Sequence, residues 1–269
     1  MAKNNKNWEK MMLSDSDSSA VSEGKDPLEM GLSEMTWFEK QKRKVRRTIE
    51  KTRETFGEEV GNSITSGVLA LYMLFMLPYA TVHSYINAPE NMALIDSFAV
   101  SAFFVFAFLA SLFTTIYHFL KPNTLHKRIA LKLDRIMVYF AIVGAYTPFC
   151  LSLVGGAMGI TLLSIELGLA ILGMFLVIFM YPRNKVGSKF AVTIYGLMGL
   201  LFLIAIKSFI PYFTSAPVMS WLLVAGLIVY VIGLFFYNGK FKFSHMVWHL
   251  MVVAAQVCHV LAYVYFFRR

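Results

Sequence analysis

Seven runs of apolar residues, separated by short polar connections, fill the chain after its first sixty or so residues. Each run reaches the roughly 17–25 residues that an α-helix needs to cross a bilayer core. The runs lack the alternation of barrel strands, and backbone inside a bilayer must satisfy its own hydrogen bonds, so helices are expected. The pattern predicts an all-α integral membrane bundle of seven transmembrane helices. The expected spans are 63–85, 97–119, 132–153, 159–181, 189–210, 217–237 and 245–267.

Charge divides the connections between these runs into two kinds. Basic stretches precede the first run ("EKQKRKVRRTIEKTR") and follow the second ("KPNTLHKRIALK"), the fourth ("YPRNKVGSK") and the sixth ("YNGKFKF"). The alternate connections, "NAPENMALID", "GGAMG" and "KSFIPYFTSAP", are acidic, neutral or carry one lysine. Because basic loops stay on the cytoplasmic side, we expect a cytoplasmic N-terminus and an external C-terminus.

Composition indicates a membrane body behind a polar tail. Residues 62–269 hold thirteen basic and four acidic residues and carry the whole net charge of +9, whereas the charges of residues 1–61 cancel. With 57% apolar residues, the chain is too apolar for an ordinary soluble domain. Cys150 and Cys258 fall inside apolar runs and suggest neither a disulfide framework nor a thiolate metal site. We expect a multi-pass protein of the cell membrane, with membrane lipids and no nucleic acid as partners.

The polar tail divides into two segments ahead of the membrane domain at 62–269. Residues 1–34 contain "SDSDSS" and few aromatic residues, so we expect disorder. In 35–61, apolar residues recur at roughly helical spacing among lysines and arginines. That pattern is typical of a basic amphipathic helix on the cytoplasmic membrane face. A solvated charge run that only enforces topology explains it equally well.

Four polar residues from three spans are expected at one depth of the membrane. His118 ends the second span, Asp134 begins the third, and His245 and His249 begin the seventh. With the predicted orientation, all four lie near the cytoplasmic side. Ionisable groups inside a bilayer are costly and usually face a cavity or a partner. Their convergence therefore indicates a polar site.

The residue types at this depth fit a zinc centre. His245 and His249 are four residues apart, so they share one helix face and can converge on one ion. His118 would complete three ligands, and a fourth position left for water is typical of catalytic zinc. Asp134 could orient or deprotonate the attacking water. Thr114, one turn before His118, could hydrogen-bond the water or the developing oxyanion.

The other ionisable residues of the membrane body fit this centre poorly. His259 lies ten residues after His249, about 15 Å further along the helix and on another face. His83 is expected at the outer end of the first span, and His126 in a basic loop. We expect these three histidines to be packed or interfacial. Glu166, in the outer half of the fourth span, is expected to be satisfied by a neighbouring helix or to line a polar pocket.

Three stretches of the chain resemble a known family. They are "EEVGNSITSG" at 58–67, "TTIYHFLKPNTLHKRIALKLDRIMVYFAIVGAYTPF" at 114–149 and "SHMVWHLMVVAAQVCH" at 244–259. In their order and spacing they resemble the hemolysin III family, the bacterial branch of the progestin and adiponectin receptor superfamily. The resemblance extends over essentially all of 58–269.

The resemblance implies seven helices around a zinc ion near the cytoplasmic side. It assigns the zinc ligands to His118, His245 and His249 and the water-orienting role to Asp134. The sequence departs from the family pattern at three accessory positions. Thr114 stands where a serine is usual, and Ser66 and Arg135 stand where many bacterial relatives have histidine.

Three functions remain open at this point. The first is an intramembrane zinc hydrolase, for which the eukaryotic relatives imply an amide-linked lipid substrate such as a ceramide. The second is a hemolysin that perturbs membranes or forms pores, as the family's name implies. The third is a receptor or scaffold in which zinc only holds helices together.

Overall fold

The apolar runs fold into helices, as predicted. The computed structural model describes residues 55–122, 124–180, 185–237, 239 and 241–267, and no strand occurs among them. The expected disordered tail (1–34) and most of the expected juxtamembrane helix (35–61) lie outside these residues. Residues 56–61 belong to the first membrane helix, which begins at Phe56.

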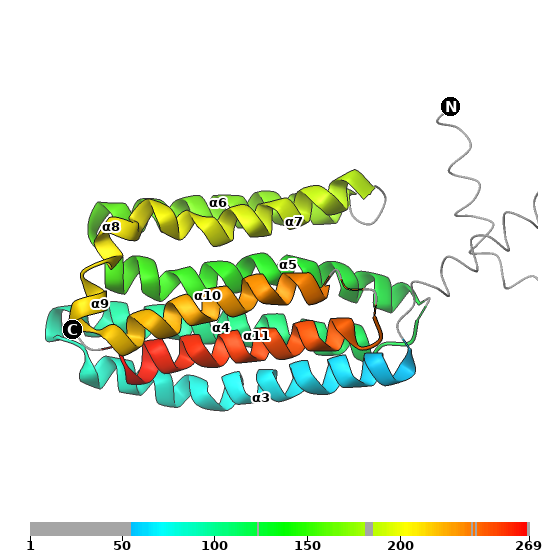
Figure 1. Cartoon of the computed structure of the whole chain (residues 1–269), viewed down its shortest axis with the longest axis horizontal. Helices are drawn as coiled ribbons and strands as arrows, with labels where there is room; N and C mark the ends of the chain where they lie inside the picture. Colours follow the sequence, from blue (N-terminus) through cyan, green and yellow to red (C-terminus); the bar gives the residue numbers. More distant parts are fainter. Residues whose placement is uncertain (1–54, 123, 181–184, 238, 240, 268–269) are drawn as a thin grey trace, which may run out of the picture. The chain divides into compact units, whose positions relative to one another are not determined.

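The described chain consists of long helices joined by short connections (Figure 1). Two π-helical segments, at 149–154 and 261–265, and two 3₁₀ segments, at 90–92 and 201–205, interrupt or extend the α-helices. The elements are α3 (Phe56–Asn87), η1 (Glu90–Met92), α4 (Ala93–Phe119), α5 (Leu125–Pro148), η2 (Phe149–Val154), α6 (Gly156–Met180), α7 (Lys185–Leu200), η3 (Leu201–Ala205), α8 (Ile206–Phe209), α9 (Tyr212–Ser215), α10 (Pro217–Tyr237), α11 (Ser244–Val260) and η4 (Leu261–Tyr265).

Six helical segments of the described chain are long and apolar enough to cross a membrane. They are Phe56–Asn87, Glu90–Phe119, Leu125–Val154, Gly156–Phe179, Pro217–Tyr237 and Ser244–Tyr265. The fifth expected span, 189–210, is divided among α7, η3 and α8, and its apolar helical part is the shorter stretch Thr193–Phe209. Six of the seven predicted spans are therefore found, while the count of seven and the orientation stay predictions.

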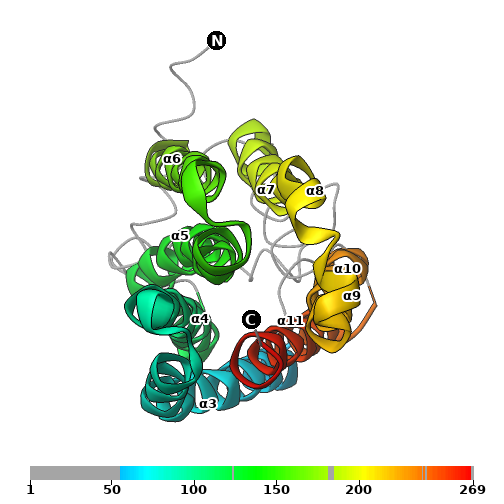
Figure 2. The same ribbon diagram turned by 90° about the vertical axis from the view of Figure 1, so that its left-hand side faces the viewer.

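Neighbouring helices in the sequence are mostly neighbours in space. α3 packs against α4, α4 against α5 and α5 against α6, while α10 packs against α11. The chain then closes on itself, because α11 also packs against α3 (Figure 2). α3 is thus a shared neighbour of α4 and α11, the two helices that carry the predicted zinc ligands.

Burial separates a central helix from the lipid-facing ones. Within the span Leu125–Val154, 61% of an 18-residue apolar stretch is buried inside the protein, against 22–39% for the corresponding stretches of the five other spans. Large apolar side chains such as Phe75, Phe98 and Phe235 are exposed on the outer helices. In a bilayer those side chains meet lipid, so their exposure is expected of a membrane-spanning bundle.

Candidate metal centre

The three predicted zinc ligands meet at one end of the bundle. His118 lies in the last turn of α4, and His245 and His249 lie in the first two turns of α11. One ring nitrogen from each histidine can be chosen so that all three lie within 4.8 Å of one another. His118 and His249 are buried and His245 is half-buried. We call this the histidine end of the bundle.

The spacing of the ring nitrogens fits a metal ion. The Nε2 atoms of His118 and His249 lie 3.3 Å apart. Two nitrogens that share a tetrahedral zinc, with Zn–N bonds of about 2.0–2.1 Å, are separated by about 3.3 Å. The three imidazoles therefore suit a three-histidine zinc site. A direct hydrogen bond between the two imidazoles explains the same distance in the absence of metal.

The outer nitrogens of two histidines are bonded to groups of α3. The Nδ1 atom of His118 lies 2.8 Å from Oε2 of Glu59, and Nδ1 of His249 lies 3.4 Å from Oγ of Ser66. Metal-ligating histidines usually bond their second nitrogen in this way, which fixes ring orientation and tautomer. With both Nδ1 atoms engaged, the Nε2 atoms are the ones directed at the shared centre.

Asp134 lies beside the histidines without belonging to their cluster. Thr114, one turn before His118 on α4, donates a hydrogen bond of 2.5 Å to Oδ1 of Asp134. Its hydroxyl also lies 3.0 Å from the carbonyl of Ala110. Oδ2 of Asp134 is 4.0 Å from Nε of Arg135. The structure thus clusters the three predicted ligands, and it bonds Asp134 to Thr114, which lies one turn before His118 on α4.

Arg135 adds a positive charge to this end of the bundle. Its guanidinium lies over the ring of Tyr237, 5.2 Å from the centroid, and the Tyr237 ring lies 5.7 Å from the ring of His245. Arg135, which stands where many bacterial relatives have histidine, therefore lies next to the candidate centre.

The remaining histidines and Glu166 lie apart from the three-histidine cluster, as expected. His259 is buried among the rings of Phe103, Tyr230 and Tyr263. His126 is exposed, and His83 packs against Tyr79 and Tyr265. Glu166 is fully buried, and neither carboxylate oxygen has a hydrogen-bond partner in the part of the chain that the structure describes.

Two adjacent glutamates near the three histidines, Glu58 and Glu59, were not predicted as site residues. Glu58 and Glu59 stand just before the first expected span, among tail residues whose charges cancel. Two signals point to them, because Thr55 and Glu58 have the spacing of a capping box and both glutamates open the stretch 58–67 that resembles the family. The structure has that box, with Oγ1 of Thr55 accepting from the Glu58 N–H and Glu58 Oε2 accepting from the Thr55 N–H at 2.7 Å. It starts α3 at Phe56 and places both glutamates in the first turn.

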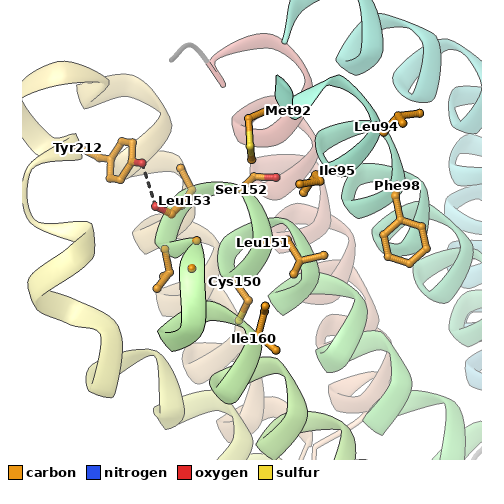
Figure 3. A pocket seen from close by; sticks show the side chains of 13 residues that line it. Met92, Leu94, Ile95, Phe98, Cys150, Leu151, Ser152, Leu153, Ile160 and Tyr212 are labelled. Carbon is orange, nitrogen blue, oxygen red and sulfur yellow. Dashed lines mark hydrogen bonds between the residues drawn. The ribbon is translucent and has the colours of Figure 1, made fainter. Parts of the chain in front are cut away.

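A cavity lies at the other end of the bundle among the described residues. It measures about 640 Å³ and is lined mainly by apolar residues of η1, α4, η2 and the start of α6, with Tyr212 donating to the carbonyl of Leu153 at its wall (Figure 3). Leu94 and Ile95 at its rim are in the first turn of α4, whereas His118 is in the last turn. The cavity is therefore separated from the histidines by the length of α4.

Comparisons with known proteins identify the family. A family model described as "Haemolysin-III related" matches residues 55–260. Hemolysin-3 of Bacillus cereus is 34% identical over 200 residues, which cover 73% of this chain and 85% of the relative. The Hemolysin-3 homolog of Bacillus subtilis (strain 168) is 34% identical over 204 residues, or 74% of this chain and 89% of the relative.

The chain belongs to the hemolysin III family. Together with the six apolar helices, this makes it a multi-pass protein of the cell membrane. The matched region includes the three histidines of the candidate centre and their neighbours Glu58 and Glu59.

Proposed function

We propose that this hemolysin III family protein is a zinc-dependent membrane hydrolase that cleaves amide-linked lipids. The observation that carries the proposal is the cluster of three histidine nitrogens within 4.8 Å, with an acid beside it rather than in it. Three protein ligands leave one position of a tetrahedral ion for a reactant. The predicted orientation puts this end of the bundle at the cytoplasmic face.

The chain's own residues would divide the work of amide hydrolysis. A zinc ion bound by His118, His245 and His249 would supply Lewis-acid activation of water and of the amide carbonyl. Asp134 accepts the proton of the attacking water and passes it to the leaving amine. Thr114 donates to Oδ1 of Asp134 and so holds the carboxylate in one orientation, with Oδ2 4.0 Å from Nε of Arg135. Arg135 contributes positive charge where the oxyanion develops.

The position of the centre supports a lipid substrate. The histidines lie at the ends of membrane-spanning helices, so a substrate must be able to approach from the bilayer or its interface. Amide-linked lipids such as ceramides present their amide at that level and their chains to the bilayer core. The choice of an amide comes from the eukaryotic relatives that the resemblance implies.

Metal removal tests the proposal. The full chain, purified in mild detergent, is incubated with ceramide and with N-acyl amino acids before and after treatment with a chelator. The proposal predicts release of free fatty acid, its loss on chelation and its return with added zinc. A protein that binds zinc but hydrolyses none of these amides would leave a non-catalytic receptor or scaffold as the better account.

Membrane lysis is the second candidate, and the relatives' name Hemolysin-3 favours it. It is tested with the same preparation on vesicles loaded with a self-quenching dye. Dye release that survives chelation, by protein without hydrolase activity, would support direct membrane perturbation. Dye release that follows fatty-acid production would make lysis a consequence of hydrolysis.

A further inference from the structure

Two adjacent carboxylates in the first turn of α3 contact the two helices that carry the predicted zinc ligands, or the residue just before them. Oε2 of Glu59 lies 2.8 Å from Nδ1 of His118 on α4. Oε1 of Glu58 accepts a hydrogen bond of 2.7 Å from the backbone N–H of Phe243, which precedes α11. One turn of one helix therefore bonds to both of its neighbours at the histidine end.

Glu59 fixes more than the direction of the His118 ring. Its other oxygen, Oε1, accepts from Nζ of Lys127 at 2.7 Å, so the carboxylate is held on both sides. A carboxylate bonded to an ammonium group offers only acceptors, and His118 must therefore donate from Nδ1. A neutral imidazole with hydrogen on Nδ1 has its lone pair on Nε2. That lone pair is the one directed at His249 and the shared centre.

Lys127 is held in place as well. Its ammonium lies 4.7 Å from the centroid of the Tyr117 ring, in addition to its bond to Glu59. The side chains of His118, Glu59 and Lys127 are exposed by only 1%, 14% and 11%. Ion pairs that are shielded from water keep their geometry better than surface pairs. The chain Lys127–Glu59–His118 is thus a connected buried support for one ligand.

Glu58 acts on the other two ligands through the backbone. Phe243 has a φ of 64°, a left-handed conformation that is uncommon for a residue other than glycine, and it is the N-cap of α11. The bond from its N–H to Glu58 holds that conformation two residues before His245. Close packing supports the contact, because a Cβ atom on Gly61 would lie 2.6 Å from Sδ of Met246.

We infer that Glu59 is a positioning residue for the metal centre, which sets the tautomer and orientation of His118, and that Glu58 places the histidine pair by anchoring the start of α11. This inference rests on the proposed metal site. It assigns to Glu58 and Glu59 a role in metal affinity, although neither belongs to the three-histidine cluster.

The first experiment compares Glu59→Gln with Glu90→Gln, a matched change at an exposed glutamate of η1. Zinc affinity of the purified full chain is measured by competition with a coloured chelator. The neutral amide no longer balances Lys127 and no longer enforces a donor at His118. We expect zinc affinity to fall by about 10–100-fold in Glu59→Gln and to stay unchanged in Glu90→Gln. Wild-type affinity in both would overturn the inference.

The tautomer of His118 tests the same inference without metal. In chelator-treated protein labelled with ¹⁵N-histidine, His118 is assigned by comparison with a His118→Asn sample. The wild type is expected to carry its proton on Nδ1, and Glu59→Gln to show a mixture or the Nε2-protonated form. A His118 tautomer that is indifferent to Glu59 would contradict the inference. This readout distinguishes its failure from that of the hydrolase proposal, which depends on bound zinc.

Glu58 has its own pair of variants. Glu58→Gln keeps an oxygen that can accept from the Phe243 N–H, whereas Glu58→Ala removes it. We expect Glu58→Ala to weaken zinc binding about tenfold and Glu58→Gln to bind nearly as the wild type does. Thermal midpoints of the metal-free proteins show whether each variant folds. Equal zinc affinities of folded Glu58→Ala and Glu58→Gln would contradict the role proposed for Glu58.

Discussion

The acidic residues at the histidine end differ sharply from the one in the middle of α6. Glu58, Glu59 and Asp134 each accept at least one hydrogen bond of 2.5–2.8 Å from a residue of the structure. Glu166 is buried more completely than any of them, at 0% exposure, yet neither of its oxygens has a partner among the described residues. Burial alone therefore does not mark a site in this bundle.

The contrast shows what a built site requires. At the histidine end, Glu59 bonds to the imidazole of His118, Glu58 to the backbone N–H that precedes α11, and Asp134 to Thr114 of α4. Glu166 lies in a buried part of α6 where the described residues provide no hydrogen-bond donor to either of its oxygens. We read the first as a preorganised centre and the second as an isolated buried carboxyl group. Substitutions at the two places can distinguish these two interpretations.

The largest effect is expected from Asp134→Asn. The change keeps the shape of the side chain but removes the proton acceptor, while the three histidines stay in place. Turnover of an amide substrate should fall by about 10²–10⁴-fold, the usual worth of a general base. Zinc content, measured in the same samples by elemental analysis, should not change. Loss of zinc in this variant would instead make Asp134 a direct ligand.

A smaller loss is expected from Thr114→Val. Valine has the shape of threonine without the hydroxyl that donates to Asp134 at 2.5 Å. A hydrogen bond to a charged group contributes about 1.5–3 kcal/mol, so turnover should fall by roughly 10–100-fold. Thr114→Ser keeps the hydroxyl and is the control, with activity close to that of the wild type. Equal activities in the two variants would show that the bond has no catalytic role.

A substitution that disturbs packing away from the histidine end should lower stability without changing zinc content. A Cβ atom on Gly173 of α6 would lie 2.3 Å from the Tyr139 ring of α5. Gly173→Ala should therefore cost about 1–3 kcal/mol of stability through overpacking and lower the thermal midpoint in detergent. Its zinc content should equal that of the wild type. Gly168→Ala is the control, since nothing lies within 4 Å of a Cβ atom there.

The smallest effect on function is expected at Glu166. Glu166→Met replaces an unpartnered buried carboxyl group with an apolar side chain of similar length. Removing such a group should raise stability by about 1–3 kcal/mol, visible as a higher thermal midpoint. Zinc content and turnover should be unchanged. A loss of activity without loss of zinc would show that Glu166 belongs to the functional machinery after all.

The sequence predicted the cluster of three histidines because depth in a membrane follows from order along the chain. Once the spans and their directions are assigned, the end of α4 and the starts of α5 and α11 must lie at one level. The helical spacing of four between His245 and His249 then places both rings on one face. The structure confirms that the three histidines meet, at nitrogen separations within 4.8 Å.

The supporting glutamates could not be predicted in the same way. Glu59 meets His118 from 59 positions away, and Glu58 meets Phe243 from 185 positions away. Such pairs depend on the packing of α3 against both neighbours, which periodicity does not determine. The fifth expected span shows a second limit of prediction from the sequence. Its apolar length is visible in the sequence, but the change from α7 to the 3₁₀ segment Leu201–Ala205 is not.

Zinc stoichiometry tests the central claim most directly. The full chain, His249→Ala and His259→Ala are purified in detergent without added metal, and each is subjected to elemental analysis. His259 is the matched control, because it is a buried histidine of α11 packed among aromatic rings. The account predicts about one zinc per chain in the wild type and in His259→Ala, and almost none in His249→Ala. Folded wild-type protein without zinc, or equal zinc in all three proteins, would contradict it.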